Sequence, residues 1–225
     1  MRTEASCVDR RLPVWSAAAE SSATALQIKI DTYWVGLKIC MKEEVANNEV
    51  TEIRISGYGG QGVVLAGQLL GKAASLYDNK SAVFTQSYGP EARGGASCAD
   101  VVVSSAPVDY PLVSHPDVLV TLFQEAYMKY RPMMKPGGLL ILESDLVQVK
   151  QDEVPHHRVP ATKIAEGLGR KIVANVVALG YLVGATNVVN REAVEESIRA
   201  TVKKQTIDLN LRAFDAGYTL AAKER

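Results

Sequence analysis

The sequence has few cysteines, and none of them are paired at a metal-binding spacing. Its three thiols, Cys7, Cys40 and Cys98, are too far apart in the 225-residue chain to form a Cys-x-x-Cys pair. Neither a local zinc site nor a locally ligated iron–sulfur cluster is therefore predicted. An odd number of cysteines without a disulfide framework is typical of a reducing compartment, so we expect a cytoplasmic protein.

The sequence also lacks an excess of charge and a long apolar run. Its 25 Lys and Arg residues balance 25 Asp and Glu residues, and the nearest thing to a basic cluster is the pair Lys203-Lys204, so no nucleic-acid surface is predicted. No apolar stretch reaches the roughly 18 to 20 residues that span a bilayer. The longest candidate, 172–184, contains Asn175 and glycines. We expect neither nucleic acid nor a membrane as a partner.

The first 40 residues show neither a sustained helical period nor a strand-and-turn pattern. They lack the basic start and apolar core of a secretory signal, and their acidic residues argue against an organellar transit peptide. Met41, in contrast, opens a stretch that leads directly into the first predicted strand. We interpret residues 1–40 as a disordered extension or a misassigned start, and residues 41–225 as a single domain.

From residue 50 the pattern is that of an α/β domain. Ile53 and Ile55 alternate with Glu52 and Arg54, which indicates a strand, and a helical period follows from residue 63. Strands are expected over 50–56, 81–86, 99–104, 116–123, 139–143 and 154–159, the last at a sheet edge, and helices over 63–77, 125–134, 172–184, 191–203 and 209–223, with one more helix capped by Thr162 that ends near 167–169. The expected helix 125–134 lies between two expected strands, and this arrangement is typical of a right-handed parallel crossover.

A glycine-rich loop follows the first strand. Its sequence is Gly57-Tyr-Gly59-Gly60-Gln61-Gly62, which matches the letters and the strand–loop–helix context of the dinucleotide fingerprint. That fingerprint also needs an acid after the second strand, and residues 84–88 contain none, while Asp78 falls in the preceding turn. An NAD or FAD site is therefore disfavoured. Two alternatives stay open: a tight turn with close helix packing, or contact with an anion or a partner, which the amide of Gln61 favours.

A second loop follows the second strand and is expected on the same rim of the sheet. It runs through Ser87 to Gly95 and contains the candidate site residues Tyr88, Gly89, Pro90, Glu91, Arg93, Gly94 and Gly95. Arg93 can direct its planar guanidinium towards a carboxylate or phosphate. The alternative is a surface ion pair between Glu91 and Arg93.

No catalytic nucleophile with a neighbouring base is visible in the sequence. His115 lies beside a proline in a predicted loop, and the His156-His157 pair lies in a polar connection, so surface roles are expected for these histidines. Glu143 and Asp145 after a strand form either a carboxylate pair or part of a turn. The residues alone indicate a binding domain.

The two loops together closely resemble the gamma subunit of the 2-oxoacid:ferredoxin oxidoreductases, especially the 2-oxoglutarate enzymes. The resemblance is carried by residues 55–66, 87–100, 116–120, 160–166 and 173–180. It implies a Rossmann-like three-layer α/β/α sandwich with a mostly parallel, mixed sheet. It also implies one subunit of an enzyme that decarboxylates a 2-oxoacid oxidatively to an acyl-coenzyme A and passes the electrons to ferredoxin.

In such an enzyme, alpha, beta and delta (ferredoxin-like) subunits are implied as partners, with thiamine diphosphate and iron–sulfur clusters on those partners. The resemblance implies that this chain contributes to coenzyme A binding, active-site closure and assembly. It assigns anion or interface contacts to Gly59, Gly60, Gln61 and Gly62, and a phosphate or carboxylate to Arg93. Two alternatives are a free-standing NAD-type protein and a noncatalytic assembly module. 2-Oxoglutarate is the expected substrate, with pyruvate, branched-chain oxoacids and indolepyruvate left open.

Overall fold

The computed structural model describes residues 50–87, 95–149 and 155–224. The interpretation of residues 1–40 lies outside the described residues, as does most of the second loop. Contacts within the chain group Asn48–Arg225 into one compact unit. Among the described residues, no helix combines the length and the apolar character needed to cross a membrane.

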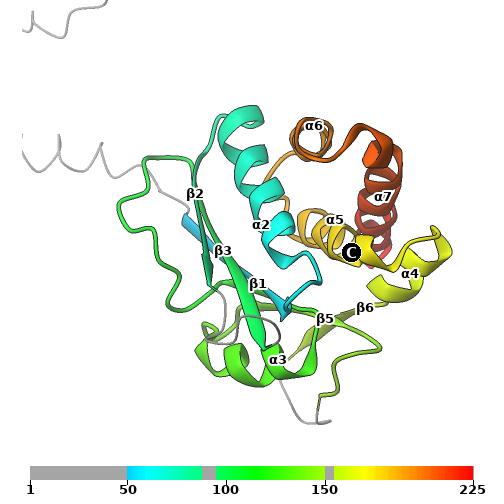
Figure 1. Cartoon of the computed structure of the whole chain (residues 1–225). Coiled ribbons are helices and arrows are strands. Elements are labelled where there is room, and N and C mark those ends of the chain that lie inside the picture. The colour runs from blue at the N-terminus through cyan, green and yellow to red at the C-terminus, as the bar shows by residue number, and fades with distance from the viewer. Residues whose placement is uncertain (1–49, 88–94, 150–154, 225) are drawn as a thin grey trace, which may run out of the picture. The chain divides into compact units, whose positions relative to one another are not determined.

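A six-stranded mixed sheet lies at the centre of this unit (Figure 1). In spatial order its strands are β2 (Ser81–Ser87), β3 (Ala96–Ser104), β1 (Val50–Tyr58), β4 (Val118–Thr121), β5 (Leu139–Glu143) and β6 (His156–Val159). Strands β1, β4, β5 and β6 pair in parallel, whereas β3 is antiparallel to both β1 and β2. The mostly parallel, mixed sheet and the edge position of the last strand are confirmed. Strand β6 includes His156 and His157, in agreement with the strand expected over 154–159, so the other interpretation of these two residues, as part of a polar connection, was wrong.

Helices cover both faces of the sheet, which confirms the three-layer sandwich (Figure 1). The helices are α2 (Val63–Lys72), continued by the π-helical turn η2 (Ala73–Tyr77), then α3 (Gln124–Tyr130) with η3 (Arg131–Met133), α4 (Ala161–Gly167), η4 (Lys171–Val173), α5 (Ala174–Thr186), α6 (Arg191–Thr201), η5 (Lys204–Thr206) and α7 (Ile207–Lys223). The larger core joins β1 to α2, α5, α6 and α7, and the smaller core lies under α3.

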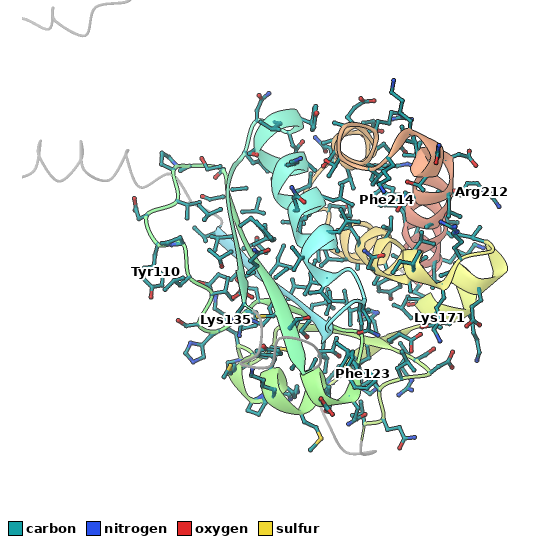
Figure 2. The ribbon with its side chains drawn as sticks, viewed as in Figure 1. Tyr110, Phe123, Lys135, Lys171, Arg212 and Phe214 are labelled. Atoms are coloured by element: carbon teal, nitrogen blue, oxygen red, sulfur yellow. The ribbon has the colours of Figure 1, made fainter. Side chains whose placement is uncertain are left out.

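Helices α5 and α7 cross with their backbones in direct contact. Helix α5 is buried on nearly all sides, as expected for a helix that is apolar all round. A Cβ atom added at Gly217 of α7 would lie 1.9 Å from the carbonyl oxygen of Val177, and one at Gly180 would lie 2.1 Å from that of Phe214. Phe214 itself is fully buried among these helices (Figure 2). Glycine at these positions therefore allows the close crossing.

A largely buried ion pair lies beneath α3 on the other face. Arg54 on β1 and Asp100 on β3 occupy paired positions, and two guanidinium nitrogens of Arg54 each donate to a carboxylate oxygen of Asp100 at 2.7 Å. The same guanidinium donates to the carbonyl of Val113 at 2.6 Å and lies 5.1 Å from the ring centroid of Tyr130. Cys98, on the same face, is buried, and burial raises the pKa of its thiol.

The free backbone N–H groups at the start of α4 donate to a different acceptor from the one expected from the sequence. The helix begins at Ala161 after Pro160, with no side-chain cap, so the prediction that Thr162 caps it was wrong. Instead the buried carboxylate of Glu143 accepts hydrogen bonds from the backbone N–H of Thr162 at 3.1 Å and from those of Asp145 and Leu146 at 2.8 and 2.7 Å. A carboxylate can replace a cap because it satisfies free N–H groups at a helix start. Glu143 thus has the turn role that the sequence left open.

Candidate functional site

The glycine loop connects the end of β1 to the start of α2 at the carboxyl-terminal rim of the sheet. Gly62 is the residue preceding the helix, has a φ of 76°, and leaves α2 without a side-chain cap or an acidic residue in its first turn. The N–H groups of a first helical turn have no acceptor within the helix, and the helix dipole is positive there. The loop therefore presents donors and partial positive charge, which together suit an anion.

The glycines of this loop have different structural roles. A Cβ atom at Gly57 would lie 2.6 Å from Oε1 of Gln61, and one at Gly62 would lie 2.5 Å from Nδ2 of Asn175. These two glycines therefore allow close packing, one of the two roles that the sequence left open. Gly60 has a φ of 98°, but a Cβ atom added there meets nothing within 4 Å. A side chain placed at Gly60 would therefore point into open space at the tip of the loop.

The side chain of Gln61 stabilises the loop from within. Its Oε1 accepts a hydrogen bond from the backbone N–H of Tyr58 at 2.7 Å, and its Nε2 donates to the carbonyl of Leu122 at 3.2 Å. Gln61 thereby ties the loop to the residue that follows β4. The anion or interface contact proposed for this side chain stays a prediction, and the structure adds this internal role.

The second loop meets the first at Gly95, its last residue. The N–H of Gly59 donates to the carbonyl of Gly95 at 3.4 Å, and β1 and β2 run in the same direction because each is antiparallel to β3. The two described ends of the second loop, Ser87 and Gly95, therefore lie on the same rim as the glycine loop, as expected. The other candidates of this loop lie outside the described residues: Tyr88, Gly89, Pro90, Glu91, Arg93 and Gly94. Their roles stay predictions.

Asn175 contacts the glycine loop, but it was not identified as a site residue from the sequence. It lies in the first turn of α5, only 3% of its surface is exposed, and its Nδ2 donates to the carbonyl of Gly62 at 2.9 Å. The sequence did contain a signal, since Asn175 is a single amide in an otherwise apolar stretch. A polar group buried in such a stretch needs a hydrogen-bond partner. The sequence could not show that this partner is the glycine loop.

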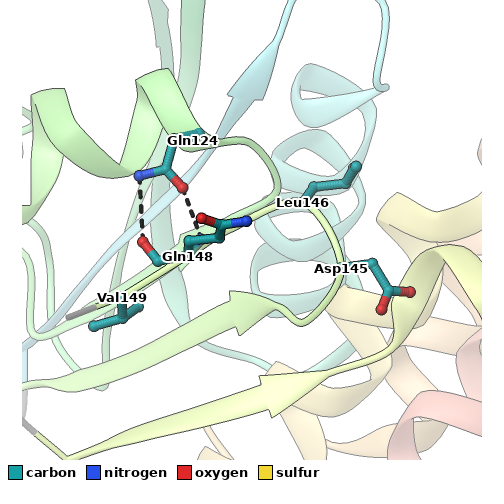
Figure 3. Close-up of a pocket in the computed structure, with 5 residues that line it drawn as sticks. All are labelled: Gln124, Asp145, Leu146, Gln148 and Val149. Carbon is teal, nitrogen blue, oxygen red and sulfur yellow. Dashed lines mark hydrogen bonds between the residues drawn. The ribbon is translucent and has the colours of Figure 1, made fainter. Parts of the chain in front are cut away.

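A hollow of about 540 Å³ lies on the same rim, next to the start of α3 (Figure 3). The residues that line it are Gln124, Asp145, Leu146, Gln148 and Val149. The amide of Gln124 accepts from the backbone N–H of Gln148 at 2.7 Å and donates to its carbonyl at 3.3 Å, as Figure 3 shows. Phe123, which precedes Gln124, has its ring centroid 5.3 Å from that of Tyr58 in the glycine-loop region. The hollow thus neighbours the glycine loop and is lined by amides, by apolar side chains and by the carboxylate of Asp145.

His157, Tyr181 and Glu224 form a structural contact group. His157 Nδ1 lies 2.7 Å from the hydroxyl of Tyr181, and that hydroxyl donates to the carboxylate of Glu224. Burial and the hydrogen bond to Glu224 raise the pKa of Tyr181. Among the residues that the structure describes, His, Cys, Asp and Glu side chains nowhere form a group of three that could hold a metal ion. The His157 contacts join β6 to α5 and to the end of α7.

Comparison with known proteins identifies the family. The family model described as pyruvate ferredoxin/flavodoxin oxidoreductase matches residues 52–220. The chain is 51% identical over 174 residues to the 2-oxoglutarate synthase subunit KorC of Methanocaldococcus jannaschii, which covers 76% of this chain and 93% of the relative. It is also similar to the crystal structure of the keto/oxoacid ferredoxin oxidoreductase gamma subunit of Geobacter sulfurreducens, with 43% identity, a TM-score of 0.71 and coverage of 77% of this chain and 97% of the other.

A more distant structural neighbour shows the same fold inside a longer chain. It is the 2-oxoglutarate:ferredoxin oxidoreductase of Magnetococcus marinus, solved with 2-oxoglutarate, coenzyme A and succinyl-CoA bound. The likeness has a TM-score of 0.70 at 24% identity and covers 77% of this chain but 31% of that one. The family match spans most of the residues from β1 to α7 and includes the glycine loop and Asn175. The chain belongs to the pyruvate ferredoxin/flavodoxin oxidoreductase family.

Proposed function

We propose that this chain is the gamma-type subunit of a 2-oxoacid:ferredoxin oxidoreductase that converts 2-oxoglutarate and coenzyme A to succinyl-CoA and carbon dioxide, with electrons passed to ferredoxin. The observation that carries this proposal is the 51% identity to a 2-oxoglutarate synthase subunit over 93% of that subunit's length. Alpha, beta and delta subunits are the proposed partners. Thiamine diphosphate and iron–sulfur clusters on those partners supply the decarboxylation and the electron transfer.

Within this complex the proposed role of the chain is to bind coenzyme A, to help close the active site and to take part in assembly. Coenzyme A carries phosphate groups, and the uncapped start of α2 offers backbone donors without a competing acid. The neighbouring hollow, lined by the amide of Gln148 and by Leu146 and Val149, suits the uncharged amide-bearing arm of the same molecule. Arg93 is proposed to add a guanidinium to the phosphate contacts.

The direct test is to purify the chain with its native partners under anaerobic conditions and to measure coenzyme A-dependent reduction of a viologen dye. Each 2-oxoacid is offered in turn, and 2-oxoglutarate is expected to give the highest kcat/KM. Preference for pyruvate, a branched-chain oxoacid or indolepyruvate would correct the substrate. A chain that purifies alone and is inactive would contradict the subunit proposal. Calorimetry with NAD and coenzyme A would then test a free-standing nucleotide-binding protein.

A charge change at the tip of the glycine loop tests whether an anion binds there. Gly60→Asp and Gly60→Asn place side chains of the same shape in open space and impose similar backbone strain at a φ of 98°. They differ in charge alone. The KM for coenzyme A is expected to be about tenfold higher for the Asp variant than for the Asn variant, because the carboxylate repels a bound phosphate.

Added salt should reduce this difference, since ions screen exposed charges. Equal KM values for the two variants at low salt would show that no anion binds near Gly60. If both variants instead lose their partner subunits during purification, the loop is an assembly contact, as the noncatalytic alternative requires.

A further inference from the structure

Asn175 connects the almost wholly buried helix α5 to the glycine loop. Its side chain Nδ2 donates to the carbonyl of Gly62 at 2.9 Å, although the two residues are 113 positions apart in the chain. The same carbonyl accepts the first helical hydrogen bond of α2, from the N–H of Ala66 at 3.1 Å. The carbonyl of Gly62 is therefore held by two donors, one from its own helix and one from α5.

This contact determines the direction of a backbone donor on the loop. In a trans peptide group the carbonyl and the following N–H lie in one plane and point in opposite directions. Because Asn175 and Ala66 hold the carbonyl of Gly62 towards the protein interior, the N–H of Val63 points away from them. That N–H belongs to the first turn of α2, where an anion would be received.

Gly62 and Asn175 also fit one another sterically. Gly62 has a φ of 76°, which side chains other than glycine rarely adopt, and a Cβ atom there would lie 2.5 Å from the Asn175 amide nitrogen. The backbone that carries Asn175 cannot shift easily, because α5 and α7 cross at Gly180 and Gly217 with no room for a Cβ atom. The amide thus approaches the loop from a rigid support.

From these observations we propose that Asn175 is a positioning residue that holds the start of α2 ready for the anion before the anion binds. The ligand named here, a phosphate of coenzyme A, rests on the proposed function above. Gln61 holds the opposite side of the loop through Tyr58 and Leu122. Two amides therefore fix the loop from inside and leave its helix-terminal donors for the ligand.

The test compares two buried asparagines in the purified complex. Asn175→Ala removes the amide that reaches the loop. Asn210→Ala is the matched control, because Asn210 of α7 is 6% exposed and its Nδ2 donates at 2.7 Å to the carbonyl of Thr206, the residue that precedes α7. Two quantities are measured: hydrogen exchange at the Ala66 amide without coenzyme A, and the KM values for coenzyme A and for the 2-oxoacid.

Asn175→Ala is expected to speed exchange at Ala66 and to raise the KM for coenzyme A about tenfold, the equivalent of one hydrogen bond, while the KM for the 2-oxoacid stays unchanged. Asn210→Ala is expected to change neither quantity, even if it lowers the melting temperature. Faster exchange with an unchanged KM for coenzyme A would support positioning and contradict the coenzyme site at this loop. Exchange at Ala66 equal to that of the wild type would overturn the positioning role, whatever the KM.

Discussion

Replacement of Gly217 by alanine is expected to lower the free energy of unfolding by about 3 to 5 kcal/mol. The added Cβ atom would lie 1.9 Å from the carbonyl oxygen of Val177 and 2.9 Å from the backbone nitrogen of Tyr181. Both contacts are with backbone atoms, so no rotamer change can relieve them. Helices α5 and α7 must separate, which removes packing along the whole crossing.

Thermal and urea denaturation of the purified chain measure this effect. A loss of this size corresponds to a melting temperature lower by about 6 to 20 °C. The matched control is Gly167→Ala at the end of α4, where an added Cβ atom meets nothing within 4 Å, and this variant is expected to change the free energy of unfolding by less than about 1 kcal/mol. Equal stability of the two variants would show that the α5–α7 crossing adapts to a methyl group.

Replacement of Arg54 by methionine is expected to lower the free energy of unfolding by about 3 to 5 kcal/mol, because it leaves the largely buried carboxylate of Asp100 without its partner. The side chains of Arg54 and Asp100 are 8% and 12% exposed, and their ion pair is made at 2.7 Å. The substitution also removes the hydrogen bond to the carbonyl of Val113. The segment before β4 therefore loses a fixed contact with the sheet.

Urea denaturation again gives the measurement, with two comparisons. Arg199→Gln removes an ion-paired arginine whose side chain is 42% exposed on α6, and it is expected to cost less than about 1 kcal/mol. The double variant Arg54→Met with Asp100→Leu is expected to recover most of the lost stability, because no charge is left unpaired. If Arg54→Met costs no more than Arg199→Gln, the pair under α3 is not a major source of stability.

The glycine-loop region shows how far local pattern could predict the structure. The alternation around Ile53 and Ile55 and the helical period from Val63 predicted β1, the loop and α2 correctly. The parallel pairing of β4 with β5 followed from a short intervening helix. The same pattern did not indicate that Arg54 is buried, because burial of a strand's second face depends on α3, which is distant in sequence.

The errors share a cause. Thr162 was expected to cap a helix, but the carboxylate that satisfies this turn comes from Glu143, 19 residues earlier. The edge strand that contains His157 was predicted, but the contact of His157 with Tyr181 of α5 was not. Each outcome depends on which distant segment packs next to the residue. Local propensity carries no information about that choice.

The sequence by itself determined the α/β class, the glycine loop between a strand and a helix, and the resemblance of the two loops to one enzyme family. These follow from hydrophobic periodicity and from motifs, which are local along the chain. Only the tertiary structure decided that Asn175 supports Gly62 and that Gln61 turns inward to Leu122. These contacts join residues 113 and 61 positions apart, and such contacts form only when the helices and the sheet pack together, because burial then forces each polar group to find its partner.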